Sequence, residues 1–380
     1  MKDAVVVGSG PNGLSAAIRL AQAGAEVLVL EAKDTPGGGM RTAEITLPGF
    51  HHDLCSGCHP TGVLSPYWST LPLAAHGLRW CFPKASVAHP LDDEPAVLLT
   101  RDVRATAENL GVDARAYERL CKPFGKRSAA LLRDALAPLG VPKDPITLAR
   151  FGLRALLPAQ ALARTVFRGP RARALLAGNA GHSVLPLDMV PSGALGLMFL
   201  VMGHAVDWPV AEGGSASITR ALVSLLESLG GRVETGRFVR GLDDLPAARV
   251  YLFDTSPAQL ANVCAPVLPA GYVRRLRRYR YGPGAFKVDW ALSEPIPWKD
   301  PRVRDASTVH LGGTLEAIAA SERAMWEGRH TDDPYMILVQ QSEHDPSRAP
   351  AGQHTGYAYC HVPAGSTEDR TDVLEAQIER

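Results

Sequence analysis

The chain has 380 residues, of which 46% are hydrophobic and 21% charged, and its formal net charge is +1. This is the composition of an ordinary globular protein, and the length predicts two domains rather than one. The near-neutral charge excludes a nucleic-acid footprint spread over the whole surface, so we expect no nucleic-acid partner.

The first predicted strand begins almost at Met1, with no charged and apolar leader segment before it. The longest uncharged apolar stretch runs over residues 192–206 and is interrupted by glycine. Because it is too short to span a bilayer, we interpret it as a buried helix. We therefore expect a cytoplasmic protein whose six cysteines are reduced.

The N-terminal segment reads as a strand, a glycine-rich turn, a helix and a second strand. Residues 4–7 form a short apolar β-branched run, and the turn Gly-Ser-Gly-Pro-Asn-Gly follows at residues 8–13. Residues 14–23 have apolar positions at helical spacing, and residues 25–30 form the second strand. The pattern predicts the βαβ unit of a dinucleotide-binding Rossmann domain.

Each polar or small residue of this unit has a physical task. Gly8 permits the tight turn, Gly10 lets the backbone approach a pyrophosphate, and Gly13 lets the helix pack closely on the strand. The helix N-terminus offers unpaired N–H groups to the anion. Glu31, at the end of the second strand, is placed to accept hydrogen bonds from ribose hydroxyls.

This unit alone leaves NAD and FAD open, and the next segment favours FAD. The run Gly37-Gly38-Gly39-Met40-Arg41-Thr42 is typical of flavoproteins that bind FAD in an extended form. Its glycines let the backbone pass close to the cofactor, and Arg41 can offer a guanidinium to the pyrophosphate. The alternative is a glycine-rich surface loop.

With these motifs the sequence resembles the FAD-dependent oxidoreductases of the phytoene desaturase-like, amine-oxidase-related superfamily. Residues 50–60, 208–215, 345–350 and 359–363 look like further segments of that family. The resemblance implies that residues 232–240 form a strand in which the Val239 backbone meets the adenine. The predicted cofactor-binding residues are Gly8, Ser9, Gly10, Pro11, Asn12, Gly13, Glu31, Ala32, Lys33, Gly38, Gly39, Arg41, Thr42 and Val239.

The resemblance also implies an α/β fold with a Rossmann-type FAD-binding domain and a discontinuous α+β substrate domain. The FAD-binding domain would comprise residues 1–84 and 205–270, and the substrate domain residues 85–204 and 271–380. The patterns agree, since residues 103–204 read mainly as helices and residues 271–363 as strands with turns. The family normally continues beyond this point and returns to the FAD domain. Residues 375–380 read as helix interior, so we expect a truncated chain in preference to one that has lost this segment.

Residues 55–59 have the spacing Cys-x-x-Cys-His, which also occurs in haem attachment and in redox pairs. Haem attachment of this kind requires export, and a redox pair would accompany a second nucleotide-binding motif, which we do not find. We therefore expect ordinary buried thiols. His182, His204, His310 and His361 lack metal-ligand spacing, so no metal site is predicted.

Lys287 lies in an alternating strand over residues 285–292. It is similar in position to the lysine that amine oxidases hold near the flavin through a water, and it is our candidate catalytic residue. The alternative is a strand lysine that points to solvent.

Residues 145–187 contain no acidic residue but six arginines between Arg150 and Arg173, interleaved with apolar residues. This pattern fits either a solvated basic helix face or a peripheral membrane contact.

The leading hypothesis is an FAD-dependent oxidoreductase that transfers hydride between an apolar, polyene-like substrate and the flavin. Amine or amino-acid oxidation is the second subclass. The rivals are an NAD-dependent dehydrogenase and a non-catalytic binding module built on a truncated flavin fold. The substrate, the electron acceptor and the oligomeric state are not encoded in any pattern that we find.

Overall fold

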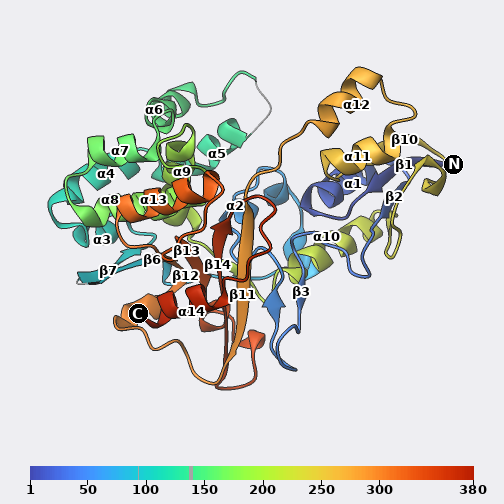
Figure 1. Cartoon of the computed structure of the whole chain (residues 1–380). Coiled ribbons are helices and arrows are strands. Elements are labelled where there is room, and N and C mark those ends of the chain that lie inside the picture. The colour runs from blue at the N-terminus through green and yellow to red at the C-terminus, as the bar shows by residue number, and fades with distance from the viewer. Residues whose placement is uncertain (93, 137–139) are drawn as a thin grey trace.

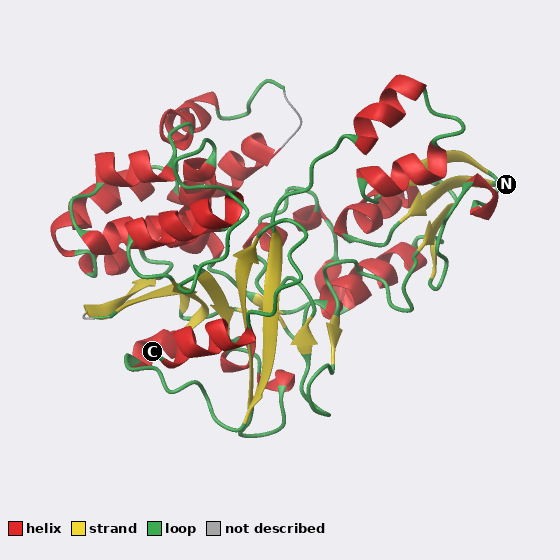
Figure 2. Ribbon diagram, in the orientation of Figure 1, coloured by secondary structure: helices red, strands yellow, loops and turns green. Residues whose placement is uncertain are grey.

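A computed structural model of the chain describes residues 1–92, 94–136 and 140–380. The molecule has two lobes, each built on its own sheet (Figure 1). One lobe carries a four-stranded sheet and the N-terminus. The other carries a six-stranded sheet, a layer of helices and the C-terminal helix (Figures 1 and 2).

The four-stranded sheet is parallel and has the order β10-β1-β2-β9. Its strands are β1 (Lys2–Val7), β2 (Val27–Leu30), β9 (Arg232–Glu234) and β10 (Ala248–Phe253). The apolar run that begins at Ala4 is buried on both faces, as expected for a central parallel strand. Helices α1 (Pro11–Gln22) and α10 (Ala216–Ser228) pack together against one face. Val239 and Leu245 pack against the other face.

The six-stranded sheet is mixed and has the order β11-β14-β13-β12-β6-β7. Only β12 and β6 pair in parallel; the other neighbours are antiparallel. The strands are β6 (Ala85–Leu91), β7 (Glu94–Leu99), β11 (Gly284–Leu292), β12 (Ala306–Leu311), β13 (Met336–Val339) and β14 (His354–Val362). The sheet therefore combines strands from two distant parts of the chain.

A layer of helices covers one face of this sheet (Figure 1). They are α3 (Val103–Glu108), α4 (Ala114–Cys121), α5 (Ser128–Leu136), α6 (Pro145–Ala155), α7 (Ala159–Val166), α8 (Pro170–Gly181), α9 (Ser192–Val206) and α13 (Leu315–Trp326). The predicted buried helix at residues 192–206 is confirmed as α9. Among the described residues, no helix is both long enough and apolar enough to cross a membrane.

The remaining elements are short or peripheral. They are β3 (Thr42–Ala43), β4 (His52–Asp53), α2 (Pro60–Val63), β5 (Trp80–Cys81), β8 (Val210–Ala211), α11 (Pro257–Cys264), α12 (Ala270–Arg277) and α14 (Thr371–Glu379). Two predictions need correction. The strand expected over residues 232–240 ends at Glu234, and the segment read as strands with turns also contains α12 and α13.

Candidate cofactor site

The glycine-rich turn follows β1 directly and has a backbone that only glycine adopts without strain. Gly8 has a φ of +103°, and its N–H donates to the carbonyl of Leu30 at 2.8 Å. A Cβ on Gly13 would lie 2.2 Å from the carbonyl oxygen of Gly8. Helix α1 then begins with Pro11 at its first position. The turn therefore presents the helix N-terminus just beyond the end of the first strand.

Asp254, directly after β10, supports this turn and was not anticipated from the sequence. Its Oδ2 accepts a hydrogen bond from the Gly13 N–H at 2.8 Å, and its own N–H donates to the carbonyl of Val7. A Cβ on Gly10 would lie 2.9 Å from the same Oδ2. The carboxylate thus caps a helix whose N-cap residue, Gly10, has no side chain to do so. Its place after an apolar strand that pairs with β1 was the signal available in the sequence.

Glu31 is buried and holds the turn from the other side. Its Oε2 accepts hydrogen bonds from the Ser9 backbone N–H and hydroxyl, and its Oε1 accepts one from the Lys33 N–H at 2.9 Å. The Ser9 hydroxyl in turn accepts from the Gly37 N–H at 3.0 Å. Glu31 therefore links the first glycine motif to the second, and its predicted contact with a ribose stays a prediction.

The second glycine motif lies directly over the first. A Cβ on Gly38 would be 3.0 Å from the Gly10 Cα, and Gly37 has a φ of +122°. The Arg41 Nε donates to the carbonyl of Gly38 at 2.8 Å. The structure therefore brings the two predicted motifs together, with Arg41 anchored to its own loop.

Thr42 and Asp53 join this loop to α10. The Thr42 hydroxyl donates to Asp53 Oδ1 at 2.8 Å and accepts from the Ala216 N–H at 3.0 Å. The other carboxylate oxygen of Asp53 lies 2.8 Å from Arg348 Nη2, and both side chains are fully buried. Arg348 also donates through Nε to the carbonyl of His51. This buried ion pair ties β4 to the segment before β14.

Two other predicted cofactor-binding positions lie next to the two glycine motifs. Ala32 is exposed, just beyond Glu31. Val239 packs on the side of the sheet opposite α1, next to Val5 and Val7. It lies outside β9, on a segment whose Arg237 N–H donates to the carbonyl of Glu31 at 2.8 Å.

Lys287 on β11 points inward rather than to solvent. Its Nζ lies 4.3 Å from the centroid of the Tyr357 ring and forms an ion pair with Asp289. His52 Nδ1 lies 3.5 Å from Asp289 Oδ1. Burial by itself would raise the pKa of Asp289, but hydrogen bonds from His52 and Lys287 hold it below its usual value. Lys287 is thus a partnered, partly buried cation.

The exposure of the Cys-x-x-Cys pair differs from the prediction. Cys55 is exposed and Cys58 partly so, which corrects the prediction that both are buried, and both thiols are free. Burial raises the pKa of the Cys58 thiol to about 11. Cys58 is therefore protonated at neutral pH, and such a thiol is a poor nucleophile.

Histidines far apart in the sequence meet beneath the helical layer. His182 Nε2 and His310 Nε2 are 2.8 Å apart, and a Cβ on Gly178 would lie 2.6 Å from His310 Nδ1 and 2.9 Å from His89 Nδ1. Burial lowers the pKa of His89 to about 4 and that of His182 to about 3. Burial also lowers the pKa of His310 well below its usual value. The described residues contain no cluster of side chains arranged to hold a metal ion.

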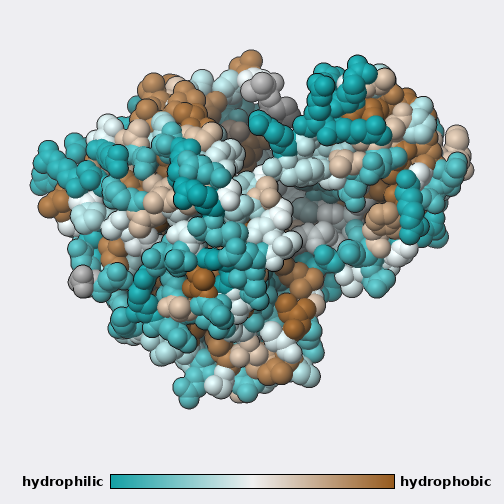
Figure 3. Space-filling view, viewed as in Figure 1, coloured by the Kyte–Doolittle hydropathy of each residue, from teal (hydrophilic) through white to brown (hydrophobic). Residues whose placement is uncertain are grey.

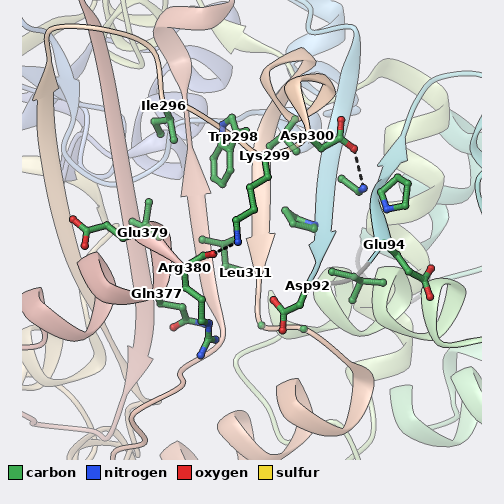
Figure 4. A pocket seen from close by; sticks show the side chains of 18 of the residues that line it. Asp92, Glu94, Ile296, Trp298, Lys299, Asp300, Leu311, Gln377, Glu379 and Arg380 are labelled. Atoms are coloured by element: carbon green, nitrogen blue, oxygen red, sulfur yellow. Dashed lines mark hydrogen bonds between the residues drawn. The ribbon is translucent and has the colours of Figure 1, made fainter.

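A cavity of about 1200 Å³ lies away from the two glycine motifs, between the β6–β7 hairpin, residues 296–303 and α14 (Figure 4). Two of its charged groups have the following partners. Asp300 pairs with Arg302, whose guanidinium helps to hold the pKa of Asp300 at about 2. Lys299 Nζ donates to the backbone carbonyl of Arg380, as the dashed line shows.

Comparison with known proteins agrees with this architecture. Residues 6–71 match the family model described as an NAD(P)-binding Rossmann-like domain. The chain has the fold of an FAD-dependent oxidoreductase. A structure of putrescine oxidase superposes with a TM-score of 0.61 at 18% identity, covering 99% of this chain and 80% of that one.

Two curated relatives are carotenoid desaturases by name. Hydroxyneurosporene desaturase of Cereibacter sphaeroides is 31% identical over 255 residues, which is 61% of this chain and 49% of that protein. Lycopene-forming phytoene desaturase of Pseudescherichia vulneris is 26% identical over 410 residues, which is 96% of this chain and 77% of that protein. The match to the first relative thus spans about half of its length. The chain is thus similar in sequence to both of these desaturases.

Proposed function

We propose that the chain binds FAD and serves hydride transfer between the flavin and a lipophilic organic substrate. The observation that carries the proposal is the stacking of two glycine motifs at the N-terminus of α1. A Cβ on Gly38 would lie 3.0 Å from the Gly10 Cα, and a Cβ on Gly10 would lie 2.9 Å from Asp254 Oδ2. Gly10 also lacks the side chain that would block a pyrophosphate. The exposed Asn12 is at the second helical position, where a backbone N–H has no intrahelical acceptor.

Within this proposal each residue has a defined task. Gly8, Gly10 and Gly13 shape the pyrophosphate cradle, and Glu31 holds the turn while offering its remaining lone pairs to the ribose. Bound FAD would supply the hydride acceptor. The proposed cofactor domain comprises residues 1–84 and 205–270, which include all strands of the four-stranded sheet.

Lys287 is the proposed proton-handling residue. Its Nζ contacts Asp289 and the Tyr357 ring, so the side chain is held in one orientation. An ammonium in this setting can orient a water or supply a proton at Nζ. The proposal predicts that Lys287→Met slows flavin reduction by roughly a hundredfold or more, without changing FAD affinity.

A polyene is the preferred substrate class because the two curated relatives described above are carotenoid desaturases. Amine oxidation is the second candidate, since putrescine oxidase shares the fold and Lys287 corresponds by resemblance to the lysine of such enzymes. In both cases the lobe with the six-stranded sheet would provide the substrate cavity, and the glycine-motif site would hold the flavin.

The test is the visible spectrum of the purified chain, followed by anaerobic addition of an acyclic polyene or a primary amine. Flavin absorbance that bleaches with the polyene supports the proposal, and bleaching only with the amine moves it to the second candidate. A colourless protein that takes up NAD but not FAD would favour a dehydrogenase. A flavin that neither substrate reduces would favour a binding module.

A further inference from the structure

Helix α6 presents an apolar face to solvent. Ile146, Leu153 and Leu156 are 64%, 77% and 69% exposed, whereas Phe151 and Ala155 on the opposite side are buried. In the space-filling view, hydrophobic side chains gather at the position of this helix (Figure 3). A helix of a globular domain normally exposes its polar side. Large apolar residues on the outer face therefore require a partner.

The charged residues on the same surface are basic. Lys143, Arg150 and Arg154 are exposed beside these apolar side chains. Of the nearby acids, Asp134 accepts a hydrogen bond from the Asp144 N–H, and Asp144 caps α6. Hydrogen bonds from Thr147, together with the ion pair with Arg127, hold the pKa of Asp144 below its usual value. Exposed leucines flanked by unpaired basic residues are the pattern of helices that lie in a membrane interface.

The arginines of the predicted basic segment are not all available for such a contact. Arg164 pairs with Glu316, Arg171 with Glu94, and Arg173 donates to the carbonyl of Phe167. Within the part of the chain that the structure describes, these three are used internally. The other arginines of that segment are Arg150 and Arg154 on α6 and the exposed Arg168 between α7 and α8.

A second and stronger basic surface lies on the other lobe, on α12 and the residues after it. All five arginines between residues 274 and 280 are exposed, and the described residues supply no ion pair to any of them. The chain has no acidic residue between Asp254 and Asp289. Tyr272, Tyr279 and Tyr281 are exposed among these arginines. Tyrosine is a residue that favours the membrane–water boundary.

The two surfaces lie on the same side of the molecule. Helices α6 and α12 both stand at the top in the view of Figure 1, one on each lobe. In the same view, Figure 3 shows an apolar region at α6 and a separate hydrophilic block at α12. An apolar anchor combined with a basic patch provides the two signals that stable membrane attachment needs.

We infer that this side of the molecule docks on an anionic lipid bilayer, with the apolar face of α6 inserted at the headgroup boundary and the α12 arginines on lipid phosphates. The inference rests on the proposed lipophilic substrate, which would be stored in such a bilayer. A nucleic acid explains the arginines but leaves the exposed leucines without a role. Charge complementarity and apolar exposure together favour the bilayer.

The test is co-sedimentation of the full chain with vesicles of phosphatidylcholine, with or without one third phosphatidylglycerol, at rising salt concentration. The wild type should bind the anionic vesicles and be released by salt. Replacing Arg274, Arg277 and Arg278 by Gln should weaken binding roughly fivefold per charge, on the order of a hundredfold in total. Leu153→Gln with Leu156→Gln should weaken binding about tenfold or more.

Matched controls are available in the same chain. Arg104, Arg115 and Arg119 are exposed on α3 and α4, and Ile45 and Leu47 are exposed after β3, so their Gln variants should bind as the wild type does. The inference is overturned if the wild type ignores anionic vesicles, or if test and control variants behave alike. It is also overturned if the leucine variants dissociate a self-assembled oligomer that shows no vesicle binding. Since FAD is not needed for sedimentation, failure here is separate from failure of flavin binding, which the spectrum reports.

Discussion

The nucleotide cradle and the histidine cluster of the substrate lobe are both buried, but they are specified in different ways. The cradle depends on backbone conformation, so glycines at fixed spacing in the sequence predict it. The cluster depends on side chains from β6, β12 and the end of α8 that meet only in the folded chain. Local backbone constraints can therefore be predicted from sequence, whereas contacts between distant elements cannot.

The largest effect is expected at the ion pair that joins distant segments. Asp53 and Arg348 are both fully buried, so Arg348→Met would leave an uncompensated carboxylate in the interior. We expect a loss of about 3–5 kcal/mol in the free energy of unfolding, measured by urea denaturation. The control is Arg329→Met, because Arg329 and its partner Glu327 are both exposed and their pair contributes at most about 1 kcal/mol. Equal losses in the two variants would contradict the account.

The second effect is acid destabilisation through the histidine cluster. Burial holds the folded-state pKa of His89 at about 4 and of His182 at about 3, below the unfolded value. Below pH ~6.5 the unfolded chain therefore binds more protons than the folded chain. As the pH falls further, the free energy of unfolding decreases by about 1.4 kcal/mol per pH unit for each such group.

Replacing one member tests this directly. His182→Phe keeps an aromatic ring beside Phe199 and Trp208 but removes the titrating group. Between pH 6.5 and 5 the variant should lose about 1.5 kcal/mol less than the wild type, measured by urea unfolding at each pH. A pH dependence identical to that of the wild type would show that the cluster does not control acid stability.

The smallest effect is expected at Asp254. Asp254→Ala removes the acceptor for the Gly13 N–H and should lower the free energy of unfolding by about 1 kcal/mol. Asp254→Asn keeps an acceptor oxygen and should lose less. Asp34→Ala, at an exposed position, is the reference and should stay within about 0.5 kcal/mol of the wild type. If Asn and Ala variants lose the same amount, the carboxyl oxygen is not acting as a cap.

Sequence reasoning recovered the βαβ unit and α9, because apolar runs and obligatory glycines leave local signals. The predicted strand over residues 232–240 was too long. β-Branched and charged residues alternate there, but the partner strand ends at Leu30. Sequence reasoning missed Asp254, Asp53 and Arg348 as structural partners. Each of these makes its defining contact with a residue more than a hundred positions away. The cofactor contacts of the predicted residues and the role of Lys287 stay predictions.

FAD binding at the two stacked glycine motifs is tested by titrating FAD with the purified chain. The quenching of flavin fluorescence reports how much FAD is bound. The wild type should saturate, and Gly10→Ala should bind at least about tenfold more weakly, because the added Cβ would meet Asp254 Oδ2 at 2.9 Å. Gly125→Ala, where a Cβ meets no atom within 4 Å, should bind as the wild type does. A wild type that leaves FAD fluorescence unchanged, or a Gly10→Ala variant with unaltered affinity, would contradict the account.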